Sequence, residues 1–216
     1  MKKKSMVYLT TQRIEAFSDG VFAIAITLLV LEIKVPHMEG SESLWAGLGQ
    51  LWSSYFGYVF SFIMIGVYWA NHHHIFHLYK KTDHYFVLLN VLFLMCISFL
   101  PFPTAVLAGY IADEPHRQAA MTFYALGLFL PAVSWLLMWL YATKGHRLVD
   151  PKLAPGFISK TTRLFLLSNG LYFVAILISL WNGIVGLILC MSLTPIFIRA
   201  PREPSYIDEN VNNDRI

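Results

Sequence analysis

The chain has 216 residues, of which 56% are hydrophobic and only 13% are charged. Soluble domains carry about a quarter of their residues as charges, so this composition excludes an ordinary soluble fold and indicates an all-α membrane protein with several spans. The formal net charge is only +3 and the basic residues are scattered, which gives no support for nucleic-acid binding. Cys96 and Cys190 lie in apolar runs and are expected to be small buried side chains.

Hydropathy and flanking charge divide the chain into six segments that are expected to cross a bilayer as helices. Residues 164–198 carry no charge and are too long for one span, so a turn is expected at residues 182–183. Pro101 and Pro103 predict a kink or stop, and Pro131 predicts a bend. The six expected spans are residues 14–35, 44–70, 85–107, 118–143, 164–181 and 184–198.

The distribution of basic residues predicts the orientation of these spans. If both termini lie inside, every Lys and Arg except Lys34 and Arg117 falls on the inner side. Cytoplasmic segments of membrane proteins are enriched in Lys and Arg, so the pattern predicts cytoplasmic N- and C-termini and a place in the cell membrane. We expect one six-helix membrane domain over residues 1–199 and a polar, disordered cytoplasmic tail over residues 200–216.

The first span contains a polar cluster made of Arg13, Ser18 and Asp19. A carboxylate at a helix centre costs roughly 2.5–3.5 kcal/mol, so Asp19 is expected to face protein or water. Ser18 and Asp19 can accept hydrogen bonds from donors on another helix. The cluster is therefore either a polar clamp that holds the helix in place, the interpretation favoured here, or an ion or proton site.

Past this cluster, Ile24, Thr27, Leu28 and Leu31 follow the spacing i, i+3, i+4 and i+7, which places them on one stripe of a helix. By itself such a stripe predicts ordinary helix packing. If the helix lines a pore, however, Thr27 offers oxygen ligands to a cation between two apolar layers, and apolar rings can close a pore by dewetting.

The second span ends in a histidine-rich segment, residues 69–77. His73 and His77 are four residues apart and could share a metal ion, but a di-iron membrane enzyme needs several separated histidine clusters, which the chain lacks. We expect some of these imidazoles, together with the indole of Trp69, to donate hydrogen bonds to the polar cluster of the first span. The sequence has no TVGYG filter and no Walker motif, which excludes ATP-driven transport by this chain alone.

Three segments resemble the transmembrane protein 175 family of potassium channels. They are residues 13–31 (RIEAFSDGVFAIAITLLVL), residues 68–73 (YWANHH) and residues 100–104 (LPFPT). The FSD motif in the first of them is the most specific. The resemblance implies a single six-helix unit of the bacterial kind that assembles as a homotetramer in the lipid bilayer, with four copies of the first helix around the pore and no re-entrant filter loop.

The resemblance also implies the role of individual residues. Ile24 would form the narrowest apolar ring, Thr27 and Leu31 would form further layers, and Leu28 would belong to the same pore and selectivity region. The expected function is a moderately selective, potassium-conducting cation channel for monovalent cations, without a catalytic site, a bound metal or another cofactor. The residues expected to anchor the pore helix are Arg13, Phe17, Ser18, Asp19, Trp69, Asn71, His72 and His73.

Several alternatives stay open from the sequence. The triple histidine does not decide whether His72 or His73 joins the anchoring cluster. A proton- or ion-coupled secondary transporter that uses Asp19 and the nearby histidines is a different class of function. A membrane enzyme built on the histidine segment is a third.

Overall fold

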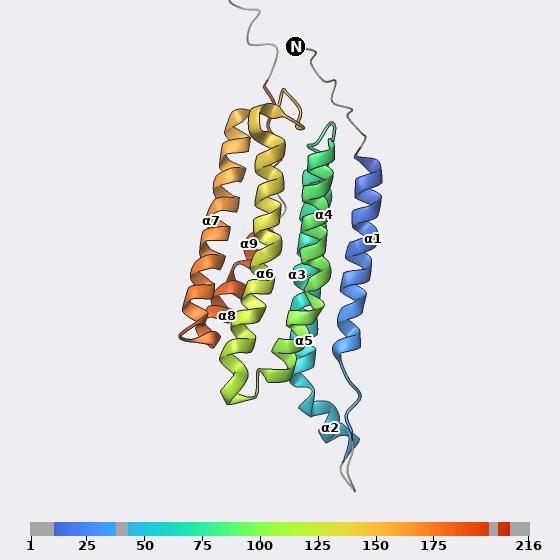
Figure 1. Cartoon of the computed structure of the whole chain (residues 1–216), viewed down its shortest axis with the longest axis vertical. Coiled ribbons are helices and arrows are strands. Elements are labelled where there is room, and N and C mark those ends of the chain that lie inside the picture. Colours follow the sequence, from blue (N-terminus) through green and yellow to red (C-terminus); the bar gives the residue numbers. More distant parts are fainter. Residues whose placement is uncertain (1–10, 38–42, 199–202, 208–216) are drawn as a thin grey trace, which may run out of the picture.

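The computed structural model describes residues 11–37, 43–198 and 203–207, and every regular element within these residues is helical (Figure 1). The order is α1 (Gln12–Leu28), continued by a short 3₁₀ turn η1 (Leu29–Glu32), then α2 (Leu44–Gln50), α3 (Trp52–Phe76), α4 (His84–Phe99), α5 (Pro101–Tyr110), α6 (Glu114–Thr143) with a 3₁₀ turn η2 (Lys144–His146), α7 (Pro155–Ser179), α8 (Gly183–Ser192) and α9 (Thr194–Ile198).

The described helices fit a multi-pass membrane protein. Four are long and apolar enough to cross a bilayer: 12–32, 84–110, 114–146 and 155–179. A fifth candidate is formed by α2 and α3, which are bent by 49° at a one-residue break, whereas Gly183–Ile198 is apolar but shorter. Six full crossings therefore stay a prediction, and the all-helical membrane fold is what the structure has.

Two of the helix breaks lie where the sequence predicted them, at Pro101 and at residues 182–183. Pro101 begins α5 directly after the break at Leu100, because its ring cannot continue the hydrogen-bond ladder of α4. Asn182 lies in the turn between α7 and α8, where its side-chain oxygen accepts a hydrogen bond from the backbone N–H of Val185 at 3.1 Å. Helix α6 runs through Pro131 without a break, and the bend expected there stays a prediction.

A close approach of two backbones holds α7 against α8. A Cβ atom placed on Gly186 would lie 2.5 Å from Cβ of Ser179 and 2.7 Å from the carbonyl oxygen of Ala175. Only glycine fits between the helices at this point, and small residues are what let membrane helices approach each other closely. The residues after the 182–183 turn therefore fold back along α7 as a tight hairpin.

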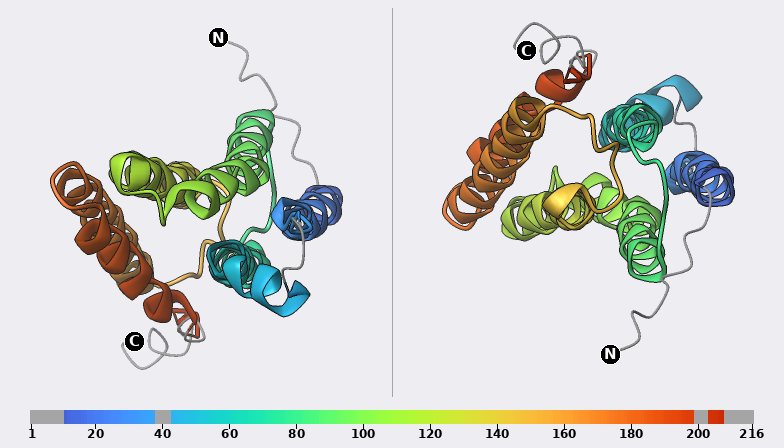
Figure 2. Two further views of the ribbon diagram at one scale, coloured as in Figure 1. Left: turned by 90° about the horizontal axis from the view of Figure 1, so that it is seen from below. Right: turned by 90° about the horizontal axis from the view of Figure 1, so that it is seen from above.

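Helix α6 lies between the α7–α8 pair and the α4–α5 pair, and α1 lies at the edge of the bundle (Figure 2). α6 packs on α4, α5, α7 and α8, and it contributes the fully buried Tyr124 and Trp139. α1 instead contacts mainly α3 and α4. One side of α1 is thus left uncovered by the other described helices.

The upper end of the bundle in Figure 1 holds the start of α1, the α3–α4 loop and the α6–α7 loop. Asp83 organises this end: its carboxylate caps the backbone N–H of Phe86 at 2.9 Å and accepts the hydroxyl of Tyr141 at 2.9 Å. Burial raises the pKa of the nearby Tyr79 phenol, so this side chain stays neutral.

Part of the C-terminal tail corrects the expectation of disorder over residues 200–216. The described residues 203–207 pair with the α6–α7 loop: Ala154 donates its N–H to the carbonyl of Ser205, and Ile207 donates to that of Lys152, each at 2.9 Å. Backbone hydrogen bonds of this kind do not depend on apolar side chains, which is why composition did not indicate them. The rest of the predicted tail lies outside the described residues.

Candidate pore-lining helix and its polar anchor

Helix α1 has two distinct faces. Ser18, Phe22, Ala25 and Leu29 form a buried stripe at spacings of three and four residues, which is the side that packs on α3 and α4. The side chains on the opposite face are largely exposed among the described residues. The predicted pore residues lie on or beside this second face.

The exposed face is apolar with one hydroxyl. Ile24 is 62% exposed and Leu31 is 60% exposed, while Leu28 lies at the edge of the face and is 40% exposed. Thr27 lies between them and donates its hydroxyl proton to the carbonyls of Ala23 (2.8 Å) and Ile24 (3.0 Å) on its own helix. Because the proton points to the backbone, the lone pairs of the Thr27 oxygen are left as acceptors on the exposed side.

A directed chain of hydrogen bonds joins the buried face of α1 to two other helices. Ser18 Oγ donates to the carbonyl of Ile14 at 2.7 Å, so it must act as the acceptor for Asn90 Nδ2, which lies at 3.0 Å. Asn90 Oδ1 then faces His72 Nε2 at 3.1 Å. An amide oxygen can only accept, so Nε2 carries the hydrogen and the imidazole donates.

These hydrogen bonds show that His72, and not His73, is linked to the polar cluster of α1. The link runs through the side chain of Asn90. Asn90 on α4 was not among the residues that the sequence predicted. The available signal was that Asn90 is the only amide in the apolar helix α4, where an amide needs a partner.

An aromatic shell surrounds the His72 ring. Phe76 stacks on it with a centroid separation of 4.0 Å, Phe93 lies at 5.9 Å, and Phe22 of α1 meets it edge-on at 5.5 Å. Trp135 of α6 completes the shell at 5.8 Å. The side chain is 1% exposed, so its hydrogen bond to Asn90 is shielded from competing water.

A second contact lies on the flank of α1. Trp69 Nε1 donates to Asp19 Oδ1 at 2.9 Å, so the carboxylate has an indole partner on α3. His73 is exposed and stacks on Trp69 with a centroid distance of 6.3 Å, and His77 meets His73 edge-on at 4.7 Å. His73 therefore supports Trp69 from outside and forms no hydrogen bond with α1 in the described structure.

The remaining residues of the predicted anchor lie elsewhere. Asn71 donates to the carbonyls of Val67 and Phe197, each at 2.9 Å, and so ties α3 to α9. Phe17 is exposed, and Arg13 is exposed with no hydrogen bond or ion pair among the described residues. Within those same residues no group of three or more His, Cys, Asp or Glu side chains is arranged to hold a metal ion.

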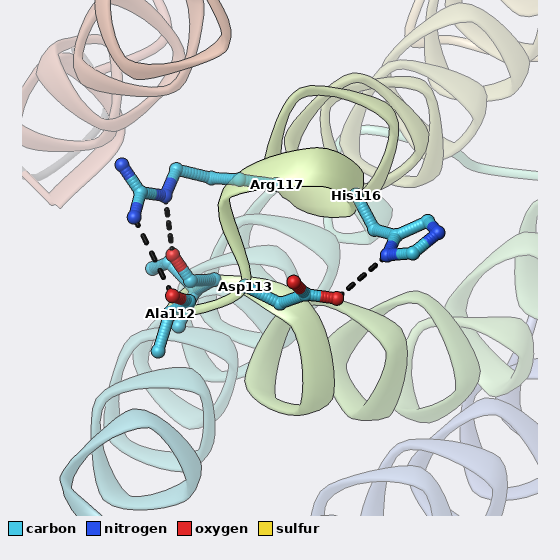
Figure 3. A network of polar contacts seen from close by, with 5 residues as sticks. Ala112, Asp113, His116 and Arg117 are labelled. Carbon is cyan, nitrogen blue, oxygen red and sulfur yellow. Dashed lines mark hydrogen bonds and ion pairs between the residues drawn. The ribbon is translucent and has the colours of Figure 1, made fainter.

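The opposite end of the bundle carries its own polar network, shown in Figure 3. Arg117 at the start of α6 donates through Nε to the carbonyl of Ile111 at 2.7 Å and through Nη2 to that of Ala112 at 3.5 Å, so it caps the end of α5. His116 faces Asp113 with Nδ1 2.6 Å from Oδ2. The charge of Arg117 thus serves helix termination.

Comparisons with known proteins place this architecture in a family. Residues 13–101 match the family model described as the endosomal/lysosomal potassium channel TMEM175. A potassium channel of Streptomyces collinus is 39% identical over 201 residues, which cover 89% of this chain and 98% of that protein. The chain belongs to the TMEM175 family. A second relative, a potassium channel of Chamaesiphon minutus, is 46% identical over 180 residues, or 81% of this chain and 88% of that protein.

The TMEM175 likeness extends to three dimensions. The crystal structure of a lysosomal potassium-selective channel TMEM175 homolog from Chamaesiphon minutus aligns with a TM-score of 0.78 at 40% identity, over 87% of this chain and 96% of that chain. The TMEM175 family is one of ion channels, so the chain is not an enzyme. The family model begins at Arg13 and covers all of α1 except its first residue, together with Trp69, His72 and Asn90.

Proposed function

We propose that this TMEM175-family protein is a potassium-conducting cation channel in which four copies of α1 line one pore. Two kinds of observation support the proposal. Two relatives that align with this chain over most of their length are named potassium channels, and one face of α1 is left uncovered by the other described helices. Closed rotational symmetry is the usual way to bring identical helices around an axis.

The observation that carries the proposal is the division of α1 into two faces. Every described side-chain hydrogen bond from α1 to another helix involves Ser18 on the buried face or Asp19 on the flank beside it. Ile24, Thr27 and Leu31 are then held on the other side. In the tetramer, Ile24 and Leu31 form apolar rings that wet or dewet, and the Thr27 oxygen compensates part of the lost hydration of a cation between them.

The proposed topology has six crossings with both termini on the cytoplasmic side. The described residues 203–207 lie beside the start of α7, and α7 leads down to the turn before α8 (Figure 1). The chain therefore returns to its starting end after α8 and α9, which supports a sixth crossing by these shorter helices. The basic-residue pattern places that end, which also holds the start of α1, inside the cell.

The test is ion flux through purified protein reconstituted in liposomes, with potassium and sodium compared. Ile24→Asn is expected to raise potassium flux, because an amide hydrates the proposed constriction. Leu167→Asn on α7 is the matched control, because Leu167 is 62% exposed, as is Ile24. An equal effect of the two substitutions, or none of either, contradicts a pore on α1.

Single-channel recording separates the channel from a coupled carrier. Unitary currents far above carrier turnover support a pore. Saturating flux without unitary events, abolished by Asp19→Asn and accompanied by proton movement, indicates instead a secondary transporter that uses Asp19 and the histidines beside it.

A further inference from the structure

A cavity of about 40 Å³ lies on the side of the bundle away from α1, where α3, α6, α7 and α9 meet. Aromatic side chains form much of its wall, among them Tyr68, Trp135 and Tyr172. Its polar lining comes from Asn71, Ser168, Asn169 and Thr194. None of the residues around it carries a formal charge.

Asn169 on α7 has an amide whose orientation is fixed by its neighbours. Its Nδ2 donates to the carbonyl of Phe165 at 2.8 Å and to that of Ala132 on α6 at 3.3 Å. Turning the amide over would set Oδ1 against two carbonyl oxygens, so the assignment of nitrogen and oxygen is decided by the contacts. Oδ1 is buried and accepts no hydrogen bond from any described residue.

A buried acceptor beside a cavity calls for a small donor. An acyl chain cannot donate a hydrogen bond, and a cation would enter without a counter-charge on the wall. A water molecule needs about 10–15 Å³ of such space, so this cavity has room for about three. Thr194 supplies a further partner, because its hydroxyl donates at 3.0 Å only to the weak thioether acceptor Met64 Sδ and can turn to a better one.

We propose that the cavity is a hydration site, in which a small water cluster donates to Asn169 Oδ1 between α3, α6, α7 and α9. The site is separate from the proposed pore and does not depend on it. Trp135 lies between the cavity and α1. The centroid of its ring is 5.1 Å from that of Phe93, and the Phe93 centroid is 6.0 Å from that of Phe22 on α1. The water cluster thus lies directly behind the aromatic shell against which α1 packs.

X-ray radiolysis with mass spectrometry tests the proposal on the full-length protein in lipid nanodiscs, because hydroxyl radicals formed from bound water oxidise the side chains beside it. The chain offers matched methionines: Met64 lines the cavity and is 3% exposed, whereas Met138 does not line it and is 0% exposed. Met64 is expected to be oxidised at least several-fold faster than Met138, and Tyr172 faster than the buried Tyr124. Equal rates within both pairs overturn the proposal.

Asn169→Leu tests the acceptor itself. Leucine fills the space of the amide and removes the oxygen, so oxidation of Met64 is expected to fall to the rate of Met138 while that of Met138 is unchanged. Persistent fast oxidation of Met64 in this variant shows that the Asn169 oxygen does not hold the water and overturns that assignment. If the variant does not fold, the comparison of the two methionines and two tyrosines in the parent protein still decides whether the cavity holds water.

Discussion

Replacing Asn90 with leucine is the most direct test of how α1 is held. The amide joins His72 on α3 to Ser18 on α1 through hydrogen bonds of 3.1 Å and 3.0 Å. Leucine has the same number and branching of side-chain heavy atoms as asparagine, so the change removes both hydrogen bonds without leaving a cavity. Ser18 keeps its bond to the carbonyl of Ile14, whereas the His72 N–H is left buried without an acceptor.

The expected cost follows from that single orphaned donor. A buried donor without a partner costs about 1–3 kcal/mol, which lowers the melting temperature of a chain of this length by roughly 2–12 °C. Tryptophan fluorescence of the purified protein during heating measures the shift, and reconstituted potassium flux shows whether α1 is still correctly placed.

A control on the same helix makes the measurement specific. Ser98→Ala also removes a polar side-chain group from α4, but the Ser98 hydroxyl is exposed and bonds only to the Met95 carbonyl of its own helix. It is expected to leave the melting temperature within about 2 °C of the parent, because surface substitutions usually change stability by no more than about 0.5 kcal/mol. If the melting temperature of Asn90→Leu equals those of Ser98→Ala and the parent protein, the hydrogen bonds of Asn90 do not stabilise the position of α1.

Three further changes test separate parts of the structure. Thr27→Ala is expected to lower the preference for potassium over sodium, because the hydroxyl oxygen is lost; identical bi-ionic reversal potentials in mutant and parent would refute this role. Trp69→Phe removes the indole donor of Asp19 and is expected to change the channel current while costing only about 0.5–1.5 kcal/mol in stability, because the pair is exposed; an unchanged current–voltage relation counts against the contact. Gly186→Ala is expected to destabilise the fold by about 1–3 kcal/mol through overpacking against α7, whereas Gly170→Ala, which has open space around it, is not; equal melting temperatures would rule out the close approach.

The helical architecture was predictable because membrane-spanning helices are long apolar segments that can be recognised from composition alone. The proline and asparagine punctuation located the break before Pro101 and the turn at Asn182, since a missing N–H and a side-chain cap act locally. The number of full crossings was less accessible. The short segment over residues 184–198 was expected from the turn before it, but mean hydropathy does not show whether so short a segment crosses fully or that α2 bends from α3.

The anchor was only partly predictable, for a physical reason. The sequence indicated Ser18 and His72 as members of the anchor. It could not indicate that Asn90 joins their side chains, because such a bridge depends on the relative rotation of three helices. Arg13 illustrates the opposite case. Its charge suggested a partner in the cluster, yet it is exposed in the described subunit, and its role stays a prediction.

The two ends of α1 are held by different kinds of force, and this separates the expected effects of mutations along it. Ser18 and Asp19 make directed hydrogen bonds, which fix both the rotation and the height of the helix. Ala25 and Leu29, farther along, are held by apolar contact alone, which is not directional. A substitution at the anchor therefore turns every layer of the proposed pore together, whereas a substitution at Ile24 changes one ring and leaves the others in register.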